Sequence, residues 1–195
     1  MNFLSTRLKK VLKEHIDLID NQEFDTLAYR LFEEEVPSEV IAEMYQVFRD
    51  RDIDIFADPD MTYIPNYWAK NSLDNSFDIP KGKIDEIFSH AFNNCRNLEI
   101  FVVPDGVNYI DSFCFYDCVN LRSITLPRTV GEIRYMTFGN CHRLETMNYR
   151  GTFSEFQQIK FDQDWISMKT DCILICGDGY NIPLKEYFKE ELPNI

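Results

Sequence analysis

The sequence predicts an α+β fold: a small helical region, then a short solenoid with a parallel strand ladder, then a C-terminal cap. Three observations support this prediction. Apolar residues recur at three- and four-residue steps up to about residue 52. From residue 81 the chain repeats a 23-residue pattern three times. Hydrophobic residues make up 45% of the 195 positions, which suits a chain folded almost throughout. We therefore divide the chain into residues 1–60, 61–149 and 150–195.

Two helices are predicted in the first 35 residues. The first follows Ser5, and its inward positions have the spacing of one amphipathic helix. They are Leu4, Leu8, Val11, Leu12, His15 and Ile19. The second runs from about Glu23 to Glu35, and its apolar face consists of Phe24, Leu27, Ala28, Leu31 and Phe32. Asp20 followed by Glu23 resembles a capping box at its start, although the serine-type cap is missing.

A third helix is predicted to begin at Pro37-Ser38 and to end by Arg51 or Asp52. Its apolar residues cover more than half of its circumference, so it is expected at the centre of a small bundle. These residues are Val40, Ile41, Met44, Tyr45, Val47 and Phe48.

Acidic residues cluster after the third helix, at Asp50, Asp52, Asp54, Asp58 and Asp60. A calcium-binding loop of the EF-hand type needs Gly at its sixth position and a bidentate carboxylate at its twelfth. Counted from Asp50, those positions hold Ile55 and Met61. The segment is therefore interpreted as an acidic turn.

The middle of the chain repeats without a gap. Identical or similar residues recur 23 positions apart in several columns, which excludes chance. The columns are Ile84, Val107 and Val130; Ile87, Ile110 and Ile133; Phe92, Phe115 and Phe138; Cys95, Cys118 and Cys141; and Leu98, Leu121 and Leu144. A single 23-residue unit cannot bury its own apolar face, so neighbouring units must stack into one continuous core.

Each unit contains one predicted strand with alternate side chains turned inward. The inward residues are Leu98, Phe101 and Val103; Leu121, Ile124 and Leu126; and Leu144, Met147 and Tyr149. Pro104 and Pro127 follow and end the strand pairing, because proline has no N–H group. Tyr63-Ile64-Pro65 is a candidate for a degenerate earlier unit, at irregular spacing.

The cysteine column is interpreted as packing, because a small, weakly polar side chain fits inside a coil. A metal site is the alternative, but stacked units hold equivalent atoms about 4.8 Å apart, so their thiolates do not converge on one ion. Cys172 and Cys176 are expected in the core of the C-terminal cap. Cys114 and Cys141, beside His142, are the best candidates for a reactive thiol, and both are expected to be buried.

The repeat resembles the BspA-like, or treponemal-type, leucine-rich repeat, which has the pattern I-x-x-x-[AC]-F-x-x-C-x-x-L-x-x-I-x-[LV]-P-x-x-V. The resemblance covers about Lys81 to Tyr149, and the third unit departs from it only at Thr137. It implies a solenoid that binds other proteins. The arrangement of a short helical head and few repeats also resembles small proteins encoded by bacteria and their phages.

The segment after the repeats resembles the terminal cap of such arrays. Tyr149-Arg150-Gly151-Thr152 opens it, and Cys176-Gly177-Asp178-Gly179 closes it. The resemblance implies an amphipathic helix, a tryptophan (Trp165) and a closing strand between them. An open repeat end would expose apolar core and unpaired backbone, so some cap is required. Pro183 to Leu192 is expected to form a short amphipathic helix.

The charge of −13 is concentrated at the start, where residues 1–60 hold seven Lys and Arg against 15 Asp and Glu, a balance of −8. An acidic surface disfavours direct nucleic-acid binding, since phosphate affinity comes mainly from Lys and Arg. A basic or nucleic-acid-binding protein partner is compatible with it. No secretory or membrane-spanning segment is recognised, so a cytoplasmic protein with free thiols is expected, in a bacterium or a phage-infected cell.

No catalytic, phosphate-binding, metal or cofactor motif is recognised, so a non-catalytic protein-binding module is predicted. Its contact surface would be the outward residues of the strands and their flanks. These are Glu99, Ile100, Val102, Arg122, Ser123, Thr125, Glu145, Thr146 and Asn148. The alternative is a phage- or mobile-element-encoded inhibitor whose acidic head imitates nucleic acid. A virion-associated structural protein is a third possibility.

Overall fold

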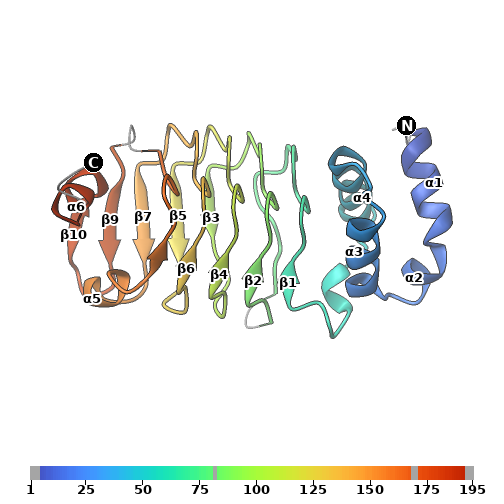
Figure 1. Cartoon of the computed structure of the whole chain (residues 1–195), viewed down its shortest axis with the longest axis horizontal. Coiled ribbons are helices and arrows are strands. Elements are labelled where there is room, and N and C mark those ends of the chain that lie inside the picture. The colour runs from blue at the N-terminus through green and yellow to red at the C-terminus, as the bar shows by residue number, and fades with distance from the viewer. Residues whose placement is uncertain (1–4, 81–82, 168–170, 192–195) are drawn as a thin grey trace.

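The computed structural model describes residues 5–80, 83–167 and 171–191. The molecule is elongated (Figure 1). Helices lie at its N-terminal end, two ladders of short strands run along its middle, and a further helix lies at the C-terminal end. The predicted α+β class and the order of helical region and parallel-strand solenoid are thus confirmed.

The predicted first helix is two helices, α1 (Thr6–Glu14) and α2 (Ile16–Asp20). The Ser5 hydroxyl caps α1 by accepting a hydrogen bond from the amide of Leu8 at 3.1 Å. The chain turns at His15, which is buried, with Nε2 3.2 Å from a carboxylate oxygen of Glu34. The prediction of one continuous helix is therefore wrong. The turn lets α1 pack on α4 while α2 packs on α3.

Helices α3 (Phe24–Glu33) and α4 (Ser38–Asp50) form the rest of the head, a name we use for α1–α4. Six residues of α4 are buried, so its predicted central position is confirmed. The predicted inward face of α3 is wrong at Phe32, whose side chain is 71% exposed. The predicted capping box is also wrong, because Glu23 makes no side-chain cap at α3. Instead the amide of Asp25 donates to the carboxylate of Asp58 at 2.9 Å.

The acidic turn after α4 uses its carboxylates to hold backbone amides. Asp54 accepts a hydrogen bond from Phe56 at the start of the short helix η1 (Ile55–Ala57), at 2.9 Å. Asp58 is buried and accepts from the amides of Asp25 and Asp60. These bonds tie the turn to the head, which accounts for part of the acidic cluster without an ion.

The repeats form two ladders of five strands each. The first contains β1 (Tyr63–Ile64), β2 (Glu86–Ile87), β4 (Tyr109–Ile110), β6 (Glu132–Ile133) and β8 (Lys160–Phe161). The second contains β3 (Ile100–Val102), β5 (Ser123–Leu126), β7 (Thr146–Tyr149), β9 (Ile173–Cys176) and β10 (Asn181–Pro183). All pairs are parallel except β9 with β10. The sequence predicted β3, β5 and β7 of the second ladder and a closing strand after them. The two-residue strands of the first ladder are too short to show an alternating pattern.

The repeat columns are buried stacks. Phe92, Phe115 and Phe138 are fully buried, with ring centroids 5.0 and 5.4 Å apart and nearly parallel planes. The Cys118 thiol donates to the carbonyl of Phe92 at 3.1 Å, and Cys141 donates to that of Phe115 at 3.1 Å. The interpretation of both columns as core is confirmed.

A degenerate unit precedes the three clear ones. Strand β1 pairs with β2 in the 23-residue register, Ile64 opposite Ile87, so the expectation of irregular spacing is wrong here. In this unit the large and the small residue of two neighbouring positions are swapped. Trp68 occupies the position that corresponds to Ala91, and Ala69 occupies the position that corresponds to Phe92. Trp68 and Ala69 are both buried, and the exchange keeps the volume of the core while hiding the motif.

Bulky residues occupy a left-handed position in every unit. Tyr67, His90, Phe113 and Met136 follow the 23-residue step with φ between 53° and 63°. This conformation costs a residue with a Cβ atom roughly 1–2 kcal/mol. The rings of His90 and Phe113 stack at a centroid distance of 5.0 Å, and contacts of this kind offset part of that cost.

The C-terminal segment closes the array. Helix α5 (Phe153–Phe156) begins with a capping box between Thr152 and Glu155. The Trp165 ring meets Phe138 edge-on at 6.0 Å, so the phenylalanine stack ends on a tryptophan. Helix α6 (Leu184–Glu191) is present where a short helix was predicted. Strand β10, which pairs antiparallel with β9, was not predicted.

Candidate interaction surfaces on the ladder and beside the head

The outward residues of the second ladder form one continuous surface, which we call the strand face. Its members are Ile100, Val102, Ser123, Thr125, Thr146, Asn148, Ile173 and Ile175. The first six were predicted, and the register places them side by side on β3, β5 and β7. Ile173 and Ile175 were missed because β9 follows β7 at a longer step, with Thr146 opposite Ile173. The alternation Cys172-Ile173-Leu174-Ile175-Cys176 was the signal that could have revealed them.

The strand face is apolar at both ends. On β3, Ile100 is 63% exposed and Val102 is 50% exposed. On β9, Ile173 is 41% exposed and Ile175 is 38% exposed. Single exposed apolar residues are common, but pairs of β-branched side chains at the same outward positions of two strands make a surface suited to contact.

The middle of the strand face is polar and fixed by hydrogen bonds. The Thr146 hydroxyl donates to Oγ of Ser123 at 2.9 Å, and Nδ2 of Asn148 donates to the same oxygen at 3.1 Å. These residues are half-buried. Side chains held in this way lose little conformational freedom when a partner binds.

Charged residues flank the strand face at its N-terminal edge. Arg122 lies between Glu99 and Glu145, with N–O distances of 3.9 and 3.0 Å. All three side chains are exposed, and such pairs contribute about 0–1 kcal/mol to stability. Their effect is therefore on the electrostatic surface that a partner meets, and less on folding.

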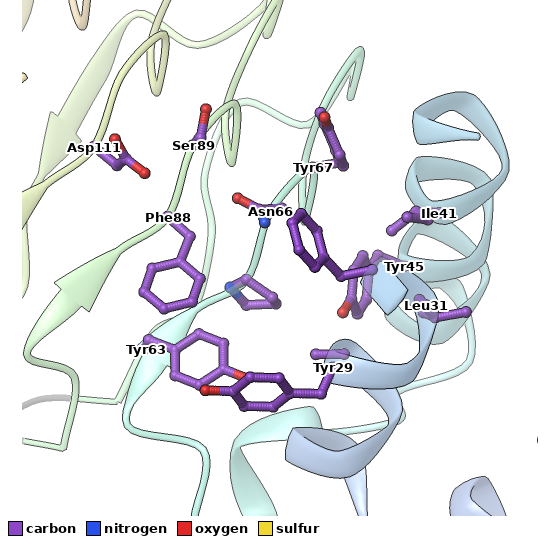
Figure 2. Close-up of a pocket in the computed structure, with 13 residues that line it drawn as sticks. Tyr29, Leu31, Ile41, Tyr45, Tyr63, Asn66, Tyr67, Phe88, Ser89 and Asp111 are labelled. Atoms are coloured by element: carbon purple, nitrogen blue, oxygen red, sulfur yellow. The ribbon is translucent and has the colours of Figure 1, made fainter. Parts of the chain in front are cut away.

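A cavity of about 390 Å³ lies between the head and the first two units, and we call it the head cavity (Figure 2). Its lining residues come from α3, α4, β1 and the turns that follow β1, β2 and β4. They are Ala28, Tyr29, Leu31, Phe32, Ile41, Tyr45, Tyr63, Pro65, Asn66, Tyr67, Phe88, Ser89 and Asp111. No sequence pattern indicated this cavity, because its walls span residues 28–111 and meet only in the folded chain.

Aromatic rings dominate the head cavity. Tyr63 stacks on Phe88 at a centroid distance of 4.3 Å, and its hydroxyl donates to Asp25 at 2.8 Å. Burial raises the pKa of Tyr63 above its usual range, with further contributions from the bond to Asp25 and the Asp25 charge. Tyr29 and Phe32 are 60% and 71% exposed. The cavity is thus lined by rings and open to solvent at the α3 side.

The two candidate reactive thiols are buried, and His90 has polar neighbours of its own. Burial raises the pKa of Cys141 to about 12 and that of Cys114 well above its usual value. The Ser89 hydroxyl lies 2.6 Å from Nδ1 of His90 and 2.9 Å from the carbonyl oxygen of Ser112. The Ser89 hydroxyl is thus shared between the imidazole and the backbone carbonyl.

Comparisons with known proteins identify the repeat. A family model described as BspA type leucine rich repeat region, with six copies, matches residues 46–171. Similar solved structures include a leucine rich cell surface protein from Faecalibacterium prausnitzii A2-165, at 30% identity over 42% of this chain with a TM-score of 0.40. They also include the pneumococcal vaccine antigen PcpA, at 23% identity over 60% of this chain with a TM-score of 0.49.

The matched regions are small parts of those two proteins, 21% of the first and 28% of the second. No curated protein matches the sequence. Within residues 5–80, 83–167 and 171–191, no helix is long and apolar enough to cross a membrane. No group of three or more His, Cys, Asp or Glu residues in the same ranges could hold a metal ion.

Proposed function

The chain belongs to the BspA-type leucine-rich repeat family, and on this premise we propose that it is a non-catalytic module that binds a protein partner through its strand face. The observation that carries the proposal is the exposure of Ile100 and Val102 to solvent on β3, the edge strand of the second ladder. The pair at Ile173 and Ile175 extends the apolar area to the other end of the face. Removing such side chains from water contributes about 25 cal/mol per Å² of apolar area, before the entropic costs of association.

The proposed contact surface combines three kinds of residue. Apolar residues at the two ends would supply the hydrophobic contribution to binding. The fixed hydroxyl and amide groups of Ser123, Thr146 and Asn148 would give specificity. Glu99, Arg122 and Glu145 would form a charged rim that affects the association rate.

The test is an affinity purification with the full chain from cells that express it. The double substitution Ile100→Asp and Val102→Asp places two charges on the strand face, at side chains that are already exposed. We expect this variant to lose partners that the wild-type chain retains at about 0.5 M salt, where exposed charges are screened. The matched control is Ile16→Asp, an exposed isoleucine in α2, which should retain them. Full retention by the double variant would contradict the proposal.

An acidic head that imitates nucleic acid is the second candidate function. It is favoured by carboxylates of residues 1–60 that face solvent: Asp17, Asp20, Glu23, Glu33, Glu34 and Glu35. A partner bound in this way should be a basic protein, should dissociate at about 0.5 M salt, and should be released by DNA. The double substitution Glu33→Gln and Glu35→Gln should weaken binding of this partner. The Ile100 and Val102 substitutions should not affect its binding. The same purification therefore separates the two candidates.

A further inference from the structure

We infer that the head cavity binds an arginine side chain of a basic polypeptide partner. This inference goes beyond the strand-face function, because the cavity lies on different elements and uses different chemistry. Its walls combine flat aromatic rings with a carboxylate, and residues 1–60, which include the head, carry a charge balance of −8. Each of these features fits a planar cation on a long apolar stem.

The rings of the cavity come from three parts of the chain. Figure 2 shows Tyr29 from α3, Tyr45 from α4, and Tyr63 and Phe88 from the first two units around one space. The outer rings, Tyr29 and Phe32, are mostly exposed, so an entering side chain can reach them without displacing core residues. A guanidinium group stacks on such ring faces, and its three-carbon stem packs against apolar walls.

The lining of the cavity includes one carboxylate, that of Asp111. Asp111 lines the cavity on the side of β4, and its Oδ1 accepts a hydrogen bond from the amide of Ser112 at 2.6 Å. Among the described residues no salt bridge involves Asp111, and the Tyr109 side chain hydrogen-bonds its carboxylate. Burial and the negative charges of Asp85 and Asp111 raise the pKa of Glu86. Negative charge is thus crowded around Glu86, and a cation bound near Asp111 would relieve part of the repulsion.

The protein already uses the same chemistry internally. The Arg49 guanidinium lies 5.2 Å from the Trp68 ring centre and 5.8 Å from that of Phe77, and it pairs with Asp74 at 3.4 Å. Near the cavity, Lys70 lies 5.2 Å from the Tyr67 ring centre and pairs with Glu39 at 3.3 Å. Both cations combine an aromatic face with a carboxylate. The head cavity has both groups, and its carboxylate lacks a cation.

The experiment is an NMR titration of the full chain with the pentapeptide acetyl-Ala-Ala-Arg-Ala-Ala-amide. The comparison peptide carries citrulline, which has nearly the shape of arginine but no charge. We expect shifts at α3 and the first two units, and affinity for the arginine peptide about tenfold higher, the effect of 1.4 kcal/mol. Equal affinity for the two peptides, or shifts confined to other parts of the molecule, would overturn the inference.

Three variants test the assignment of the site. Tyr29→Ala and Asp111→Asn should each weaken arginine-peptide binding about fivefold or more, whereas Tyr29→Phe should keep it, because the ring face remains. Tyr135→Ala removes an exposed ring outside the cavity and should change nothing. The inference fails if Tyr135→Ala weakens binding as much as Tyr29→Ala. It also fails if a leucine pentapeptide binds more tightly, or if the chain dimerises through Phe32 and excludes the peptide.

The strand-face double variant separates this inference from the proposed function. Ile100→Asp with Val102→Asp should bind the arginine peptide with unchanged affinity, since neither residue lines the cavity. Conversely, Asp111→Asn should retain a strand-face partner. Either proposal can therefore fail while the other stands.

Discussion

At the scale of single residues, burial determines the chemical state of the thiols. All six cysteines are free and buried. A thiolate inside the solenoid would lose its hydration, so desolvation raises the pKa of Cys114, Cys118 and Cys141. At neutral pH these groups are neutral S–H donors to backbone carbonyls, and they contribute to packing.

The raised thiol pKa values predict a loss of stability at alkaline pH. The folded chain holds the Cys141 proton up to a pKa of about 12, whereas the unfolded chain releases it near 9. Stability from this group is complete below pH 9 and is lost as the pH rises towards 12. The slope is about 1.4 kcal/mol per pH unit for each such thiol. Urea unfolding at a series of pH values, in reductant, measures it. Cys141→Ala should flatten the dependence, and equal slopes for both proteins would refute the argument.

Single residues also account for two wrong predictions about the head. The capping box was expected from Asp20 and Glu23, but Asp58, 33 positions after Asp25, accepts the hydrogen bond of that amide. A cap supplied from a distant segment leaves no local sequence pattern. Phe32 was assigned to the core by its spacing, yet it lies on the open side of the head cavity. Helical spacing identifies an apolar stripe about 100° wide or more on the helix. It does not show how much of that stripe a neighbouring element covers.

At the scale of elements, the units that keep the 23-residue period could be predicted from the sequence. The elements that depart from this period could not. The columns of the three units followed directly from the 23-residue step, because stacked units share one core. Strand β9 was only partly predicted, because its pairing with β7 breaks that step. The degenerate unit was hidden because Trp68 and Ala69 exchange large and small positions. The head cavity could not be predicted, because its lining residues come together only when the head packs on the array.

The phenylalanine stack predicts a large and local stability effect. Phe115 is fully buried between Phe92 and Phe138. Its replacement by alanine should lower the free energy of unfolding by about 3–5 kcal/mol, because it loses apolar burial and leaves a cavity between two rings. Phe32→Ala, at an exposed ring, is the matched control and should change stability by less than about 0.5 kcal/mol. Urea denaturation measures both variants. Similar losses for the two would mean that the column is not the core of the array.

At the scale of the whole molecule, the head and the array share one core. Buried residues form a continuous cluster from Leu8 in α1 to Tyr187 in α6. Trp68 joins the head to the first units through Phe56 and Phe92, and Trp165 closes the far end against Phe138. Repeat arrays can lose cooperativity when neighbouring units are weakly coupled. Here apolar contacts cross every boundary, so the chain is expected to unfold as one unit.

The two tryptophans allow this expectation to be tested, because one lies at the junction of head and array, the other lies in the C-terminal cap, and the sequence has no others. The variant Trp165→Phe leaves Trp68 as the fluorescent probe of the head junction, and Trp68→Phe leaves Trp165 as the probe of the cap. In each variant the fluorescence and far-ultraviolet circular dichroism transitions in urea should coincide, as two-state unfolding requires. Dichroism at 222 nm reports mainly on the helices, which lie mostly in the head. If the Trp165 signal changed at a urea concentration where the helical signal was intact, cap and head would unfold separately. The core shared along the array would then be too weak to make the chain unfold as one unit.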